Sequence, residues 1–221
     1  MKIPYEAPAP LGREFIELAP EVEAAILITL VAGWRQACAF NDVNAQAGEV
    51  VMTERLRDGM RSELKSKGHP WGKLLMVLAG TESRSSSAVV VPDGRTDIAL
   101  MLIEIFFTMQ EHDPHAIIEC KRIVGSDKHL CREYVVEGID RFRSGKYGQN
   151  HAVGFIVGYV LTGTFAEAAA GVNAYLTRRA RAVEHLEPAD ICLEALSWAS
   201  LHLRATPLSP VRLHHTFLEF G

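Results

Sequence analysis

The uncharged run GFIVGYVLTG at 154–163 restricts the fold of this chain more than any other segment. It has the length of a strand, and a strand without charged positions is typically buried on both faces of a sheet covered by helices. A second apolar strand is predicted at 116–123 (AIIECKRI), and the residues between them, 128–143, have the apolar spacing of a helix. We therefore expect an α/β fold in which these two strands are neighbours.

Further helices and strands are predicted on both sides of this unit. A helix at 20–38 begins at a proline, and a second helix at 53–66 begins with Thr53 as its cap. Thr164 and Glu167 form a capping box that starts a helix ending near position 182. The remaining segments expected to be extended are 73–79 (strand or short helix), 88–91, 97–107, and the alternating, half-buried strands 199–205 and 211–220.

Composition sets the general class of protein. A length of 221 residues suits a single domain, 1–221, and 48% hydrophobic with 23% charged residues is typical of a globular core. The formal charge of −4 excludes a strongly basic chain that coats nucleic acid, but it does not exclude a local basic patch. No apolar run reaches the roughly 18 residues of a membrane span. The start, MKIPYEAPAP, lacks the apolar stretch of a secretory peptide, and the four cysteines lack metal-ligand spacing, so we expect a cytoplasmic protein with free thiols.

Two carboxylates and a lysine form the pattern that most directly indicates chemistry. Glu119 and Lys121 lie two residues apart on a predicted strand, so their side chains share one face. Asp97 lies at the start of the preceding strand. An antiparallel pairing with Asp97 opposite Glu119 would bring the three side chains together, with the connecting loop centred near position 108. A turn at 111–115 would place Asp97 too far along its strand to reach Glu119.

Two converging carboxylates form an oxygen-ligand site suited to Mg²⁺ or Mn²⁺. Such an ion can bind a phosphate oxygen and lower the pKa of a water, and Lys121 could orient that water or offset negative charge in the transition state. These are the requirements of phosphodiester hydrolysis. The alternative for Glu119 and Lys121 is an exposed ion pair on an edge strand.

The segments PDGRTDIAL (92–100) and AIIECKRI (116–123), followed by a helix and an apolar strand, resemble the PD-(D/E)xK nuclease superfamily. The resemblance implies a restriction-endonuclease-like core over about 53–163: a helix, a three-stranded antiparallel meander, a helix and a fourth strand. Residues 1–50 and 164–221 would elaborate that core. It also implies a metal-dependent nuclease with a catalytic Asp97, Glu119 and Lys121, the first two holding Mg²⁺ or Mn²⁺.

The resemblance leaves two residue choices open. Many members add a glutamate from the first core helix, and Glu54 in TERL is the best match, although an acid in a first helical turn is also ordinary. The literal Pro-Asp pair ends at Asp93, which is the alternative to Asp97. By analogy, the substrate is expected to be DNA more than RNA, in restriction or antiviral defence, with a homodimer or a partner defence protein.

Basic residues around the predicted site suggest where nucleic acid would bind. Residues 121–146 hold seven Lys and Arg against four Asp and Glu, a local charge of +3. We expect Arg122, Arg141 and Lys146 to contact a nucleic-acid backbone. The alternative is a solvated helix whose charges pair with one another.

Two other functions are compatible with the sequence. The first is a catalytically inactive nucleic-acid-binding or assembly module on the same fold. The second is an enzyme that uses the C-terminal histidines His202, His214 and His215 as a zinc site, although hydrogen-bonded strand residues are the simpler interpretation.

Overall fold

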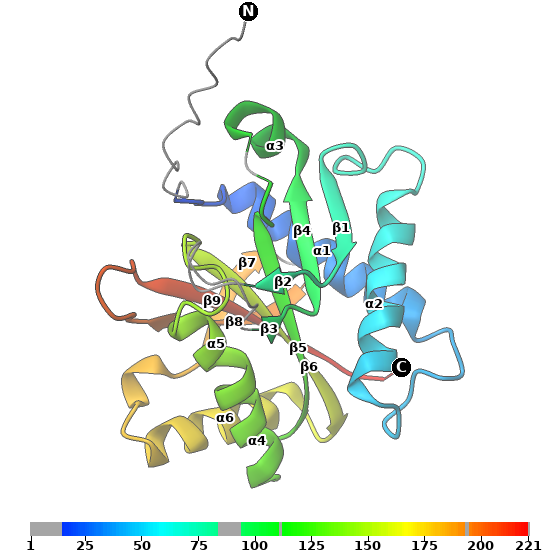
Figure 1. Ribbon diagram of the computed structural model, residues 1–221. Coiled ribbons are helices and arrows are strands. Elements are labelled where there is room, and N and C mark those ends of the chain that lie inside the picture. Colours follow the sequence, from blue (N-terminus) through cyan, green and yellow to red (C-terminus); the bar gives the residue numbers. More distant parts are fainter. Residues whose placement is uncertain (1–14, 84–93, 111, 193–194, 221) are drawn as a thin grey trace, which may run out of the picture.

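A mixed seven-stranded sheet runs through the molecule in the order β1-β4-β5-β6-β9-β8-β7 (Figure 1). The computed structural model describes residues 15–83, 94–110, 112–192 and 195–220. The strands of this sheet are β1 (Leu75–Ala79), β4 (Ile98–Leu102), β5 (Ala116–Val124), β6 (Val153–Thr162), β7 (Glu187–Cys192), β8 (Ala195–His202) and β9 (Val211–Leu218). A separate two-stranded sheet pairs β2 (Glu82–Ser83) with β3 (Gly94–Arg95).

Helices lie on both faces of the sheet. They are α1 (Pro20–Ala37), α2 (Glu49–Leu64), α3 (Ile103–Met109), α4 (Lys128–Tyr134), α5 (Asp140–Arg143) and α6 (Phe165–Arg178), with a π-helical segment η1 (Val135–Ile139) joining α4 to α5 and a 3₁₀ turn η2 (Ala182–Glu184). None of the helices in the described part of the chain has the length and apolar character needed to cross a bilayer.

The strand directions confirm the α/β class. β1, β4 and β5 form an antiparallel meander, whereas β5 and β6 are parallel and are connected through α4, η1 and α5. β6 also runs parallel to β9, and β9, β8 and β7 are antiparallel. The predicted neighbours at 116–123 and 154–163 are therefore adjacent central strands.

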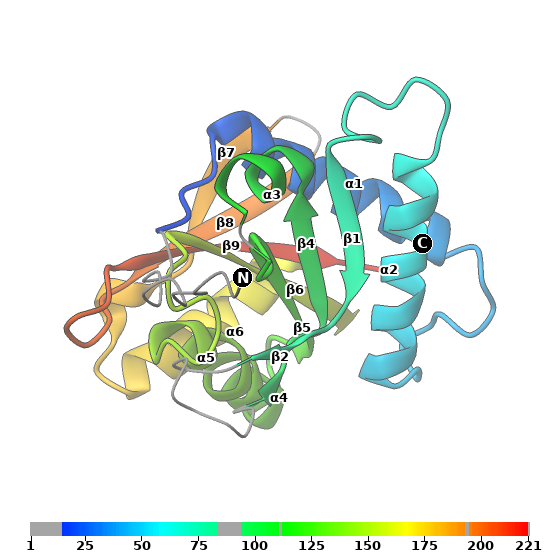
Figure 2. The same ribbon diagram turned by 45° about the horizontal axis from the view of Figure 1, so that its top comes forward.

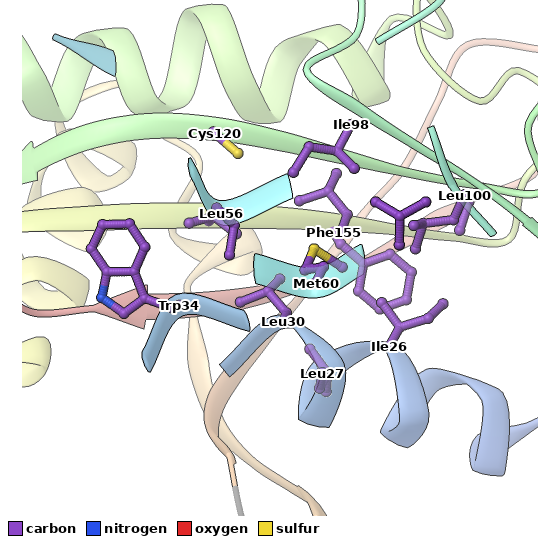
Figure 3. Packing of buried hydrophobic residues seen from close by; sticks show 14 of the residues in the cluster. Ile26, Leu27, Leu30, Trp34, Leu56, Met60, Ile98, Leu100, Cys120 and Phe155 are labelled. Carbon is purple, nitrogen blue, oxygen red and sulfur yellow. The ribbon is translucent and has the colours of Figure 1, made fainter. Parts of the chain in front are cut away.

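Two hydrophobic clusters cover the two faces of the sheet. One joins α1 and α2 to alternate residues of the central strands, and Figure 3 shows Ile26, Leu30 and Met60 of these helices beside Ile98 and Phe155 of the sheet. The other joins α4, η1, α5 and α6 to the opposite face. β6 is buried along eight successive positions because it contributes to both clusters, as its uncharged sequence predicts.

Helices α1 and α2 touch through their backbones. A Cβ atom added at Gly59 of α2 would lie 2.1 Å from the carbonyl oxygen of Gly33 in α1, and one added at Gly33 would lie 2.6 Å from the amide nitrogen of Met60. No side chain larger than hydrogen fits at this crossing without movement of a helix. The two glycines therefore fix the position of α2 relative to α1.

The segment 97–107 is not one long strand, which corrects the sequence prediction. β4 ends at Leu102 because β1 begins opposite it, at Leu75, and β5 begins opposite Leu100. Beyond Leu102 the described chain has no strand to pair with, so the backbone satisfies its own hydrogen bonds in α3. The end of β4 is therefore set by its neighbours and not by its own apolar run.

One further prediction is corrected, one strand was not predicted, and one predicted segment lies outside the described residues. Helix α2 begins at Glu49 with Gly48 as its cap, so Thr53 is not a cap; its hydroxyl lies 3.2 Å from the hydroxyl of Tyr159 inside the protein. β7 was not predicted because EPADIC contains a proline and acids, which suit the terminal strand of a sheet. Segment 88–91 is not described.

Candidate active site

The predicted pairing of β4 with β5 is confirmed. Ile98 pairs with Ile118 and Ala99 with Ile117, so the next position places Asp97 opposite Glu119. At Asp97 a side-chain hydrogen bond replaces the backbone hydrogen bonds between the strands: Oδ2 of Asp97 accepts from the amide of Cys120 at 2.7 Å. This contact holds the Asp97 carboxylate against β5, where the sequence analysis placed it. The alternative, Asp93, lies outside the described residues.

Glu119 and Lys121 project from β5 toward the side of the sheet covered by α4, η1 and α5. The Nζ of Lys121 lies 2.8 Å from Oε1 of Glu119 and 3.8 Å from Oδ2 of Asp97, and it donates to the carbonyl of Cys120 at 2.8 Å. Glu119 is 1% exposed and Lys121 is 8% exposed. An exposed pair on an edge strand is therefore wrong, since β5 is internal and both residues are buried.

Helix α2 supplies a third carboxylate, but from Glu49 and not from Glu54. Oε1 of Glu49 lies 3.3 Å from the Nζ of Lys121, and its Oε2 accepts from the amide of Arg122 at 3.1 Å. Glu54 is exposed and forms an ion pair with Arg57. Glu54 does line the same cavity of about 210 Å³ as Glu49 and Asp97, so it stands near the site without contacting Lys121 in this structure.

Arg141 belongs to the site itself. Its Nη1 lies 3.1 Å from Oε1 of Glu119 and donates to the hydroxyl of Tyr147 at 2.5 Å, while Nη2 donates to Glu137 at 3.0 Å. The hydroxyl of Tyr147 in turn donates to the carbonyl of Arg95 at 2.6 Å. These bonds aim the guanidinium at Glu119, and the predicted contact of Arg141 with a nucleic-acid backbone stays a prediction.

The other two predicted nucleic-acid contacts lie at the edge of the site. Arg122 follows Lys121 on β5 and so projects to the other face of the sheet; it is half-buried. Lys146 is also half-buried and its side chain packs against Gly94 of β3. Their role in binding remains a prediction.

Burial raises the pKa values of both central carboxyls. It raises the pKa of Glu119 to about 8, with a contribution from the charge of Asp97, although Lys121 and Arg141 oppose the shift. Burial likewise raises the pKa of Asp97 against the effect of Lys121. For Lys121, burial would lower the pKa, but Glu119, Asp97 and Glu49 outweigh it and raise the value. Three carboxyl groups therefore face two cations, so the site can accept the charge of a further cation.

The donor atoms fit a hard divalent cation. All the acidic ligands are oxygens, and Oε2 of Glu119 is buried without a hydrogen-bond partner among the described residues. Within residues that the structure describes, no group of three or more His, Cys, Asp and Glu side chains has the arrangement to hold a metal ion. Mg²⁺ commonly takes only one or two carboxylates and completes its shell with water and phosphate oxygens. Asp97 and Glu119 suit such a site.

Comparisons with known proteins do not assign a family. No family model, curated protein or solved structure matches the chain. The resemblance to PD-(D/E)xK nucleases therefore rests on the motif residues and their arrangement.

The C-terminal histidines form a second polar cluster, which lies within the protein. His202 and His215 are each 0% exposed, and the Nε2 atoms of both lie within 2.7 Å of the hydroxyl of Ser200. Their Nδ1 atoms contact Glu184 and Tyr134, respectively. His214, on the other face of β9, contacts Glu23 at 2.7 Å. All three are hydrogen-bonded strand residues, and in the described chain they form no metal-binding group.

The protonation state of Glu184 determines which atom donates in each hydrogen bond of this cluster. Burial would raise the pKa of Glu184, but hydrogen bonds from Arg181 and His202 outweigh it and lower the value, so Glu184 is an ionised acceptor. His202 must then carry its proton on Nδ1 and accept from Ser200 at Nε2. Ser200 consequently accepts from Nε2 of His215, whose Nδ1 accepts from Tyr134. Every donor in this series of hydrogen bonds, from Tyr134 to Glu184, has an acceptor only while the imidazoles of His202 and His215 are both neutral.

This requirement predicts that the protein loses stability in mild acid. Burial lowers the pKa values of His202 and His215, so below about pH 6.5 the unfolded chain binds protons that the folded chain does not. Stability should fall by up to about 1.4 kcal/mol per pH unit for each histidine as the pH decreases. Urea denaturation between pH 7.5 and 5.5 should show a shallower decrease for His215→Asn. His129→Asn is the control, since His129 is 71% exposed; equal slopes in wild type and His215→Asn would contradict the prediction.

Proposed function

We propose that the protein is a metal-dependent nuclease of PD-(D/E)xK type that hydrolyses phosphodiester bonds, with DNA as its substrate. The observation that carries this proposal is the convergence of Asp97, Glu119 and Lys121 at one point between β4 and β5. Buried acids are costly unless they are paired or bind a metal, and here three acids share two cations.

The order of elements supports the proposal. Helix α2, the meander β1-β4-β5, the helical segment α4-η1-α5 and strand β6 follow one another as the restriction-endonuclease-like core requires. The candidate site lies within this part of the chain, with Asp97 from the second meander strand and Glu119 and Lys121 from the third. The N-terminal helix and β7, β8 and β9 extend the sheet and one hydrophobic cluster.

Each residue has a defined task in hydrolysis. Asp97 and Glu119 would hold Mg²⁺ or Mn²⁺, which when bound would polarise a phosphate oxygen and acidify a water. Lys121, fixed by Glu119 and the Cys120 carbonyl, would orient the attacking water and offset charge on the phosphate. Arg141, held by Tyr147, would supply a second cation to the same phosphate. Glu49 would hold the Lys121 ammonium in place.

Cleavage and thermal stability in Mn²⁺ test this function together. Wild-type protein should cut plasmid DNA with Mg²⁺ or Mn²⁺ and not with EDTA. At 100 times its dissociation constant, the ion should stabilise the protein by about 2.7 kcal/mol, or a Tm increase of about 5–10 °C. Asp97→Asn should lose most of both effects because it removes a ligand oxygen charge.

Asp58→Asn is the matched control, since Asp58 is an exposed acid on α2 that pairs with Arg61. It should cut and respond to Mn²⁺ as wild type does. Equal Tm increases in wild type and Asp97→Asn would remove Asp97 from the metal site. Absence of metal-dependent cleavage would favour the inactive binding module.

A further inference from the structure

A large open cavity lies between the C-terminal half of α2, the loop after it and β1. Its volume is about 860 Å³. In Figures 1 and 2, α2 and β1 stand side by side at one end of the sheet, with the loop joining their upper ends. We call this cavity the α2–β1 groove; it is lined by Arg61, Leu64, Lys65, Ser66, Gly68, His69, Pro70, Gly72, Lys73, Leu75, Met76 and Val77.

The α2–β1 groove is basic in an acidic protein. Arg61, Lys65 and Lys73 line it together with His69, and none of the described residues that line it is acidic. Asp58 lies beside the groove, on the exposed side of α2, with its Oδ1 3.6 Å from Arg61. Since the whole chain has a formal charge of −4, this concentration of cations favours an anionic ligand.

Part of the positive charge of residues 121–146 is paired with acids in and around the candidate site. Arg141 contacts Glu119 and Glu137, and Arg143 contacts Glu184 at 3.6 Å. Lys121 is surrounded by carboxylates. These three cations are therefore already paired, whereas Lys128 and Arg132 of the same segment are exposed.

Helix α2 connects the groove to the candidate site. At its first turn Glu49 lines the smaller cavity with Asp97, and Arg57 lines it two turns later. Arg61, one turn further on, lines the groove and fixes the helix to β1 by donating to the carbonyl of Val77 at 2.9 Å. The rise from Glu49 to Arg61 is about 18 Å, a length that several nucleotides of a strand can cover.

We propose that the α2–β1 groove binds the phosphodiester backbone of a single nucleic-acid strand that leads to the candidate site. The identity of the ligand rests on the proposed function. Cations on α2 and in the loop face the phosphates, while Met76, which is 44% exposed, and the ring of His69 offer surfaces to bases. A duplex keeps its bases stacked inside and could not use those surfaces, so the groove is specific for an unpaired strand.

The experiment measures binding of a fluorescein-labelled 12-nucleotide single strand by anisotropy in EDTA, over a range of NaCl concentrations. Lys65→Ala with Lys73→Ala should flatten the slope of log affinity against log salt by about 1.4, because each phosphate contact on a single strand contributes about 0.7. At 0.1 M salt this corresponds to a loss of affinity of about 25-fold. The same sequence as a blunt duplex should bind more weakly than the single strand to the wild type.

Arg178→Ala with Arg179→Ala is the matched control, since it removes two exposed charges from the end of α6 and should leave the slope unchanged. An unchanged slope for the Lys65 and Lys73 variant would overturn the proposal. Equal binding of the duplex and the single strand would also overturn it. Competition by inorganic phosphate at the same phosphate concentration would overturn it too, because it would indicate a site for small anions.

Cleavage kinetics separate this proposal from the proposed function. The Lys65 and Lys73 variant should raise KM on a single-stranded substrate and leave kcat unchanged, because neither residue contacts the candidate site. If the wild type binds the strand in the groove but never cuts it, the nuclease proposal fails and the groove stands. If cleavage requires Lys121 but KM is unaffected by the double variant, the groove assignment fails alone.

Discussion

Lys121→Met should reduce cleavage by at least about 100-fold to 1000-fold and leave binding of a DNA strand nearly unchanged. The loss follows from removal of a preorganised cation that acts on charge developing in the transition state. Methionine keeps the apolar stem that packs near Gly138 of η1, where a Cβ would lie 3.7 Å from Cγ of Lys121. Single-turnover cleavage in Mn²⁺, with binding measured separately, gives the two quantities.

The same variant has a second, smaller effect on stability. Lys121 offsets Glu119, Asp97 and Glu49, so its loss leaves three acids close together without their nearest cation. Tm should decrease in EDTA, and Mn²⁺ should restore part of the loss. Lys128→Met, at the exposed start of α4, is the control and should cut normally. Cleavage by Lys121→Met near the wild-type rate would show that Lys121 is not catalytic.

Gly59→Ala should destabilise the protein by about 3 kcal/mol and lower Tm by about 10 °C, the largest stability effect that we expect from one methyl group. The added Cβ would lie 2.1 Å from the carbonyl oxygen of Gly33, so α1 and α2 must separate. That cost exceeds the roughly 1 kcal/mol that alanine gains over glycine inside a helix. Differential scanning calorimetry measures the change.

Gly48→Ala supplies the matched control, because a Cβ at the cap of the same helix would meet no atom within 4 Å. It should shift Tm by no more than a few degrees. Because α2 carries Glu49 and one wall of the α2–β1 groove, Gly59→Ala should also weaken strand binding. A Tm equal to that of wild type would mean that the two helices are not fixed by this contact.

The sequence was most informative where spacing alone determines geometry. The two-residue step from Glu119 to Lys121 placed both on one face, and the requirement that Asp97 reach Glu119 selected the register that the structure has. The apolar run of β6 predicted a central strand, because a strand that is buried on both faces typically has no charged residues. These inferences needed no knowledge of distant parts of the chain.

The missed residues depend on contacts that spacing does not reveal. Glu49 was overlooked because α2 begins at a glycine cap, which is weaker as a sequence signal than Thr53 four residues after Glu49. Arg141 was predicted only as a nucleic-acid contact, because its direction toward Glu119 is set by Tyr147 and the Arg95 carbonyl, from two other segments. The helix α3 likewise results from the ends of β1 and β5, not from its own apolar sequence.

The hydrogen-bond chain from Tyr134 to Glu184 has a consequence for how this protein can evolve. Each member donates to the next, so a change at one position alters the proton that its neighbour requires. Replacement of Ser200, at the centre, leaves two imidazoles without a hydrogen-bond partner, whereas a change at either end leaves one. Substitutions at these five positions are therefore expected to be coupled, and a change at Ser200 should cost more stability than a change at either end.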